Sequence, residues 1–152
     1  MCSSDLVIVE PLDPPELFQW FTDLRSSLGM NVVPLGPDAA SAVLSALRRN
    51  EIVCLLCDRD IQGGGIEVSF FGENTTLPAG PAMLGMRANA AVLPTAVYFT
   101  SKVDGHHAVI KPPLSLDREG GLREAVSRAT QLLANDLEDL IDRKSTRLNS
   151  SH

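Results

Sequence analysis

Long hydrophobic runs are missing from this sequence: no apolar stretch approaches the roughly 20 residues that a membrane-spanning helix needs. Basic residues are also few, since 13 lysines and arginines stand against 19 acidic residues and the formal net charge is −6. This balance argues against nucleic-acid binding, because neutralising backbone phosphates requires a basic surface. It also provides no general attraction to anionic lipid, so we expect any contact with a membrane surface to be local.

Cysteine is scarce as well, with Cys2, Cys54 and Cys57 giving an odd count. The last two have C-x-x-C spacing, but they lie in the apolar run at residues 52–57, where a strand is expected. Side chains three residues apart on a strand face opposite sides, which disfavours a shared metal ion. We therefore expect buried structural thiols in a reducing compartment, and we assign the chain no metal and no cofactor.

The two ends differ from the rest of the chain. Residues 1–5 follow no pattern and have no basic region of the kind that opens a signal peptide, while residues 144–152 are polar and aperiodic. Both stretches resemble adapter-derived or vector-derived sequence, and we expect them to be a non-native leader and tail. The part between them, residues 6–143, is expected to be one partial domain, truncated at both ends. Its length and a 44% apolar share are sufficient for a core.

Apolar periodicity divides the chain into alternating strands and helices. Strands are predicted at residues 7–10, 31–35, 52–57, 66–70, 91–99 and 107–110. Helices are predicted at residues 13–28, 36–49, 80–90 and 122–140, with loops at 58–65 and 72–77. This alternation predicts an α/β fold with a mostly parallel central sheet flanked by helices. The uniformly apolar run at 52–57 is expected to be covered on both faces.

The first predicted helix has clear start and stop signals. Asp13 is followed by two prolines, which suits a helix N-terminus, and Gly29 suits a left-handed ending. Between them, one helical face carries Leu17, Phe21, Leu24 and Leu28. Arg25 lies late in this helix, where it could bind an anionic headgroup or simply compensate the helix dipole.

Charged residues follow the most apolar predicted strand directly. In open α/β sheets, ligands bind beyond the carboxyl ends of strands, and Asp58, Arg59 and Asp60 come immediately after Cys57. These three charges and the glycines at 63–65 form a candidate site, although a solvated surface turn explains the same spacing. The glycines are only a weak indication of phosphate binding. They lack the G-x-x-x-x-G-K-[ST] pattern and lead into a strand rather than a helix.

Two further carboxylates, Glu67 and Glu73, flank an aromatic pair. Glu67 could point into a cleft or occupy the wet face of its strand. Because adjacent strand residues point opposite ways, either Phe70 or Phe71 could meet an acyl chain or lipid.

Several segments, in their order and spacing, resemble one family. They are Leu17-Phe-Gln-Trp-Phe-Thr-Asp-Leu-Arg25, Val53-Cys-Leu-Leu-Cys-Asp-Arg-Asp60, Gly65-Ile-Glu-Val-Ser-Phe-Phe-Gly-Glu73, Pro78-Ala-Gly-Pro-Ala82 and Leu93-Pro-Thr95, with the short Leu28-Gly-Met30 between the first two. Together they resemble bacterial lysophospholipid acyltransferases, in the branch shared by lipid A lauroyl/myristoyl acyltransferases and the actinobacterial phosphatidylinositol mannoside acyltransferases. The second, third and fourth segments favour the mannoside branch. The resemblance covers nearly all of residues 7–141.

The resemblance implies a glycerolipid-acyltransferase-like domain, bound peripherally at the cytoplasmic face of the plasma membrane. It implies transfer of a fatty acyl group from acyl-CoA or acyl carrier protein to a sugar hydroxyl of a membrane glycolipid, here phosphatidylinositol mannoside. The family's general base is the histidine of an H-x-x-x-x-D/E motif. This sequence lacks the motif, because His106 is followed five residues later by Lys111 and His107 by Pro112. We therefore expect this fragment to be inactive alone.

The resemblance also distributes roles among the remaining residues. It implies that Glu67 and Asp58 are assisting acids, and the substrate-binding residues it implies are Arg25, Arg59, Asp60 and Glu73. Local membrane contact would come from an apolar side chain, Phe70 or Phe71, and from the cations Arg48, Arg49 and Arg87. Two alternatives remain: a non-catalytic α/β module that binds an anionic ligand at the 58–65 loop, and another α/β transferase with its nucleophile elsewhere.

Overall fold

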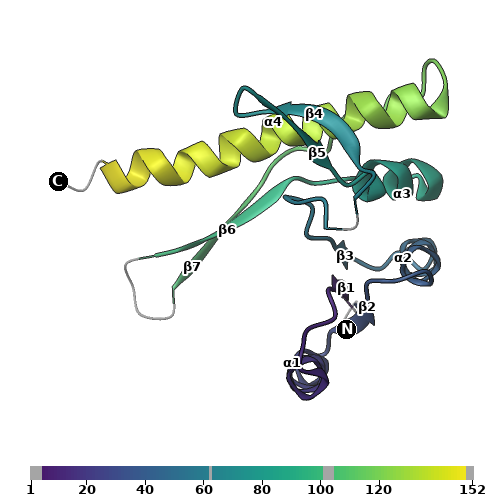
Figure 1. The fold of residues 1–152 in the computed structure, drawn as a ribbon, viewed down its shortest axis with the longest axis vertical. Helices are drawn as coiled ribbons and strands as arrows, with labels where there is room; N and C mark the ends of the chain where they lie inside the picture. Colours follow the sequence, from purple (N-terminus) through teal and green to yellow (C-terminus); the bar gives the residue numbers. More distant parts are fainter. Residues whose placement is uncertain (1–4, 62, 101–104, 150–152) are drawn as a thin grey trace. The chain divides into compact units, whose positions relative to one another are not determined.

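The computed structural model describes residues 5–61, 63–100 and 105–149, with side chains described as far as Asp142. These residues form an α/β fold with a parallel sheet and two antiparallel hairpins, so the predicted class is confirmed (Figure 1). The chain divides into two compact units. The first comprises Met1–Leu56 with Arg87–Ala90, and the second comprises Cys57–Met86 with Ala91–His152.

The first unit is built on a three-stranded parallel sheet. Strands β1 (Leu6–Val9), β2 (Asn31–Pro34) and β3 (Val53–Cys54) lie in the order β2-β1-β3. Parallel neighbours cannot be joined by a tight turn, so each connection contains a helix. Helix α1 (Pro15–Ser27) joins β1 to β2, and helix α2 (Ala39–Arg48) joins β2 to β3.

The two helices of this unit differ in how they pack. Helix α2 buries Ala39, Val43 and Ala46, whereas α1 buries no residue. On the predicted apolar face of α1, Phe21 is half-buried but Leu17, Leu24 and Leu28 are exposed. The predicted stop of α1 is confirmed, because Gly29 follows it at φ +86°, a conformation that a side chain would strain.

The strand predicted at residues 52–57 is shorter than expected. Only Val53 and Cys54 pair with β1, while Ile52 and Leu56 are 58% and 85% exposed. The expectation of a strand covered on both faces is therefore wrong, because the pairing ends after two residues and no layer among the described residues of this unit covers the side chains of Ile52, Cys54 and Leu56. The expectation of buried thiols also fails in part, since Cys54 is exposed and Cys57 is only partly buried.

The second unit begins with an antiparallel hairpin of β4 (Ile66–Phe70) and β5 (Glu73–Leu77). Its turn residues Phe71 and Gly72 have φ values of 51° and 78°, and positive φ at both central positions is the requirement of a type I′ turn. The prediction of a loop at residues 72–77 is thus wrong. Glu-Asn-Thr-Thr has no apolar alternation, and strand pairing rather than burial holds most of β5 in place.

Helices α3 (Gly80–Ala88) and α4 (Leu122–Asn149) complete the core of this unit. One buried cluster packs α3 against α4 through Ala82, Met86, Ala125, Val126 and Ala129. A second cluster joins the hairpin to α4 through Val68, Leu77 and Ala134. No helix in the described part of the chain is long and apolar enough to cross a membrane.

Side chains of α4 also satisfy the outer edge of β4. The Gln131 amide accepts a hydrogen bond from Ser69 N–H at 2.9 Å and donates to Ser69 C=O at 2.9 Å. Further along α4, the Glu138 carboxylate accepts a hydrogen bond from Phe71 N–H at 2.7 Å. These bonds fix the hairpin against the helix in addition to the apolar cluster.

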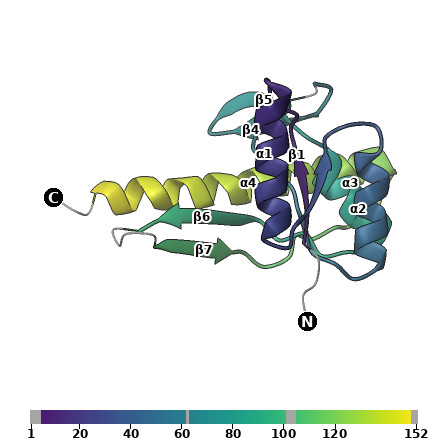
Figure 2. The same cartoon turned by 90° about the horizontal axis from the view of Figure 1, so that it is seen from below.

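A second hairpin, β6 (Thr95–Phe99) with β7 (His106–Ile110), confirms the predicted strand pair. Its predicted turn lies partly outside the described residues. Strand β6 runs along α4 with β7 on its far side (Figure 2). Tyr98 donates a hydrogen bond to the Leu140 carbonyl, and Lys111 forms ion pairs with Asp136 at 2.6 Å and Asp139 at 2.7 Å.

Candidate functional site

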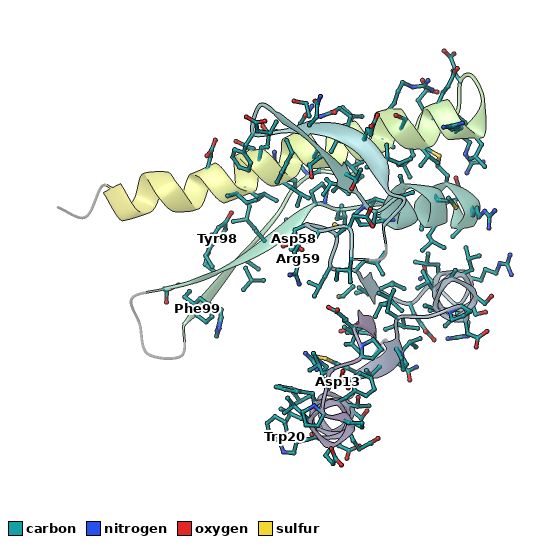
Figure 3. All side chains as sticks on the ribbon, viewed as in Figure 1. Asp13, Trp20, Asp58, Arg59, Tyr98 and Phe99 are labelled. Carbon is teal, nitrogen blue, oxygen red and sulfur yellow. The ribbon has the colours of Figure 1, made fainter. Side chains whose placement is uncertain are left out.

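The predicted site residues Asp58 and Arg59 lie on the segment that leads into the β4–β5 hairpin. Both side chains are exposed (Figure 3), whereas Asp60 is partly buried. They do not follow a strand directly, because β3 ends at Cys54. The charged segment therefore belongs to the second unit and is placed by the hairpin, not by the end of the parallel sheet.

Asp60 is held by three hydrogen bonds from its own neighbourhood. Its Oδ1 accepts from the backbone N–H of Gly63 at 3.0 Å, and its Oδ2 accepts from Gly65 N–H at 2.8 Å. The Thr76 hydroxyl donates to the same Oδ2 at 3.1 Å. Hydrogen bonds to a carboxylate are stronger than those between neutral groups. Asp60 therefore ties the start of the segment to its glycines and to strand β5.

The glycines at positions 63–65 are each required for a structural reason. Gly63 and Gly64 have φ values of +74° and +76°, which glycine adopts without strain. At Gly65 the constraint is space, because an added Cβ would lie 2.5 Å from the Leu77 carbonyl oxygen and 2.7 Å from Asp60 Oδ2. The N–H groups of Gly63 and Gly65 point to a carboxylate of the same chain. Two of the backbone donors that an anionic ligand would need are thus already used.

Strand register places Glu67 on the same hairpin face as Thr76, the residue that donates a hydrogen bond to Asp60. Glu67 lies directly opposite Thr76, and opposite residues of an antiparallel pair point to the same side. The other face carries Val68 and Leu77, which are buried against α4. Glu67 is therefore exposed on the outer face of the hairpin, where Asp60 is bound through Thr76.

The remaining predicted site residues are Glu73, on the same hairpin, and Arg25, in the other unit. Glu73 pairs with Phe70, so the register assigns it to the other face, at the turn end of the hairpin. Arg25 belongs to the first unit, where its guanidinium carbon lies 5.4 Å from the centre of the Phe21 ring. The structure therefore places Asp60, through Thr76, on the same hairpin face as Glu67, and Asp58 and Arg59 directly precede Asp60 in the chain. Thr76 itself escaped sequence reasoning because its strand was predicted as a loop.

Among the residues that the structure describes, neither a thiol nor a histidine completes a nucleophile–base pair at this site. Burial, with a smaller contribution from the Asp58 charge, raises the pKa of Cys57 to about 11, so this thiol stays protonated near neutral pH and is a poor nucleophile. His106 and His107 are exposed on β7, and the His106 ring packs 5.1 Å from that of Phe99. The local chemistry is thus that of a cation and carboxylates on a fixed hairpin: it can bind hydroxyls and phosphate.

Comparison with known proteins agrees with the sequence pattern. The profile of the bacterial lipid A biosynthesis acyltransferase family matches residues 1–147. A phosphatidylinositol mannoside acyltransferase of Mycobacterium tuberculosis strain H37Rv is 46% identical over 98 residues, which is 62% of this chain and 31% of that protein. The enzyme of the same name from Mycolicibacterium smegmatis is 37% identical over 125 residues, covering 80% of this chain and 40% of its own length. The chain thus matches 31% to 40% of the length of these relatives, and it belongs to the bacterial lipid A biosynthesis acyltransferase family.

Proposed function

We propose that this chain forms part of an enzyme that transfers a fatty acyl group to a sugar hydroxyl of phosphatidylinositol mannoside. The observation that carries the proposal is the 37–46% identity to relatives named for that activity. The match to the M. smegmatis enzyme covers 80% of the chain, so wherever it begins it includes Asp60, Glu67 and Thr76. The donor is acyl-CoA or acyl carrier protein.

In this reaction the acceptor hydroxyl oxygen attacks the thioester carbonyl, the carbon–sulfur bond breaks, and the thiol leaves with a proton. The hydroxyl proton passes to a general base, which by the family resemblance is a histidine outside this sequence. Within this chain, Glu67 and Asp58 assist by accepting hydrogen bonds from sugar hydroxyls. Arg59 binds an acceptor phosphate, a task that suits a guanidinium because it donates several hydrogen bonds in one plane. Glu73 and, in the first unit, Arg25 are further substrate-binding residues by the family resemblance.

The exposed glycine segment also bears on the non-catalytic alternative. That alternative requires backbone N–H groups at residues 58–65 to hold an anion, as in other glycine-rich loops. Because Asp60 accepts from Gly63 and Gly65, an anionic ligand would have to displace a carboxylate that is covalently part of the chain. Acyl transfer therefore has the stronger support.

A chimera tests the proposed reaction. The segment of the M. smegmatis enzyme that aligns with this chain is replaced by the residues of this chain, and the purified chimera is assayed with labelled palmitoyl-CoA and phosphatidylinositol mannoside. We expect labelled product at a rate within about tenfold of the parent enzyme, because grafts between related folds keep their packing pattern. The matched control is the parent enzyme prepared identically. A folded chimera that transfers no label to phosphatidylinositol mannoside would contradict the proposal.

A lipid acceptor also requires contact with the membrane surface, and we propose that this contact is peripheral and lies at the cytoplasmic face. Phe71 is the better of the two aromatic candidates, because it is 47% exposed whereas Phe70 packs against the cluster around Val68. Arg48 and Arg87 are exposed, but Arg49 donates to Glu51 at 2.7 and 2.9 Å and is a weaker candidate.

The membrane contact is tested by sedimenting the chimera with phosphatidylinositol-containing liposomes. Phe71→Asn should lower the bound fraction about fivefold, since burying part of a phenylalanine is worth roughly 1 kcal/mol and asparagine tolerates the positive φ at this position. Phe99→Asn is the matched control, because Phe99 is 85% exposed on the other hairpin. If the unmodified chimera stays in the supernatant at low salt, or if both variants bind equally, the contact does not lie at Phe71.

A further inference from the structure

The family resemblance implies that Asp60 contacts the substrate directly. Its hydrogen bonds in the structure indicate a different role. Its two carboxylate oxygens receive three hydrogen bonds, from Gly63 N–H, Gly65 N–H and the Thr76 hydroxyl, at 2.8–3.1 Å. A carboxylate has about four acceptor positions, so most of its capacity is used within the chain. The side chain is partly buried, whereas the preceding Asp58 and Arg59 are exposed. Asp60 is thus built into the fold while its neighbours are free to meet a ligand.

The bond to Thr76 fixes Asp60 on one face of the hairpin, and Asp58 and Arg59 directly precede Asp60 in the chain. Thr76 lies opposite Glu67 in the β4–β5 ladder, so its hydroxyl and the Glu67 carboxylate leave the sheet on the same side. Asp60 reaches that side because Gly65 has no side chain: a Cβ there would overlap Asp60 Oδ2 and the Leu77 carbonyl. The position of Arg59, next to Asp60 in the chain, is therefore tied to Glu67 through Asp60 and Thr76.

We propose that Asp60 is a positioning residue: with Thr76 and the glycine backbone it forms a latch that holds Arg59 beside Glu67 for binding of the acceptor's phosphate. This inference rests on the proposed acyl transfer to a phosphate-bearing glycolipid. It assigns Asp60 no contact with substrate. Loss of the latch leaves Arg59 chemically intact but lets it move, so binding of the anionic acceptor weakens while binding of the acyl donor does not.

The latch itself is tested in the 152-residue chain by NMR-detected amide exchange. Asp60→Ala should increase the exchange rates of the Gly63 and Gly65 amides about tenfold, because each amide loses one charge-assisted hydrogen bond. The exchange rates of the α4 amides should stay unchanged. Thr76→Val removes one of the three bonds and should produce a smaller increase. Thr76→Ser keeps a hydroxyl and is the matched control, with exchange as in the unmodified chain. Unchanged exchange at Gly63 and Gly65 in Asp60→Ala overturns the latch.

Its role in binding is tested in the chimera with the same three variants. For Asp60→Ala the KM for phosphatidylinositol mannoside should rise about tenfold while the KM for palmitoyl-CoA stays within twofold. Thr76→Val should show a weaker rise and Thr76→Ser none. A fall in kcat with both KM values unchanged reflects fewer folded molecules and overturns the positioning role. An unmodified chimera that is folded but inactive contradicts the acyl-transfer proposal instead, and the exchange measurement still decides whether Asp60 forms the latch.

Discussion

Incubated with labelled palmitoyl-CoA and phosphatidylinositol mannoside, the 152-residue chain should form product at least about 10²-fold more slowly than the chimera that contains the same residues. The reason is the missing H-x-x-x-x-D/E motif: a positioned general base typically contributes ~10²–10⁴-fold. No residue described here replaces it. Cys57 has a pKa of about 11 and is therefore a poor base. His106 and His107 lie exposed on β7, and five residues after each of them, where the motif requires an acid, the chain has Lys111 and Pro112.

The comparison needs a chain that is folded, so circular dichroism of both proteins accompanies the assay. His106→Gln and His107→Gln are the matched variants, and neither should change the residual rate of the isolated chain. Turnover within tenfold of the chimera would show that the base lies inside this sequence. A loss of that turnover in either histidine variant would then identify it.

Leu77→Ala should lower the free energy of unfolding by about 3 kcal/mol, the usual range for a buried leucine being ~2.7–5 kcal/mol. Leu77 is 1% exposed and joins Val68 and Ala134 in the cluster that packs the β4–β5 hairpin on α4. Its carbonyl also faces Gly65, so a cavity here weakens the support of the glycine segment. Urea denaturation followed by the helical circular dichroism signal measures the change.

Leu122→Ala is the control for this substitution, because Leu122 is 55% exposed at the first residue of α4. Its effect should stay within about 0.5 kcal/mol, as for most surface positions. If Leu77→Ala costs less than 1 kcal/mol, the hairpin does not depend on this cluster. Its attachment would then depend more on the Gln131 and Glu138 hydrogen bonds.

The sequence predicted helices better than strands, and particular residues explain why. Val126, Leu133 and Leu140 recur at helical spacing and are buried in α4, so periodicity and packing agree at these positions. The run 52–57 is apolar throughout, yet it pairs over only two residues because apolar character alone does not provide a neighbouring strand. In the opposite case, residues 73–77 are mostly polar and still form β5, since a type I′ turn at Phe71-Gly72 sets the pairing.

For the candidate site, the sequence predicted which residue types gather in one segment but not how they are bonded. Asp58, Arg59 and Asp60 stand out as charges beside glycines, and their role in a site stays a prediction. The partner of Asp60 was not predictable, because Thr76 lies 16 residues later in a strand that the sequence did not reveal. The close approach of Gly65 to Leu77 is likewise a tertiary fact. The roles of Glu67, Glu73 and Arg25 in catalysis or binding remain predictions.

The bonds from Gln131 and Glu138 to strand β4 have a consequence for association between chains. An unpaired strand edge is a template on which another strand can add, and proteins protect such edges with charges or with covering side chains. Here the Gln131 side-chain amide bonds to both backbone groups of Ser69, as a neighbouring strand would. The Glu138 carboxylate accepts from the next outward N–H, that of Phe71, and adds a negative charge to the edge. The protected segment, Ile66-Glu-Val-Ser-Phe-Phe71, is short, β-prone and bears a single charge, which are the properties of segments that stack into fibrils. Helix α4 therefore protects this edge against intermolecular pairing, and any condition that detaches the helix exposes both the edge and the apolar face of the hairpin.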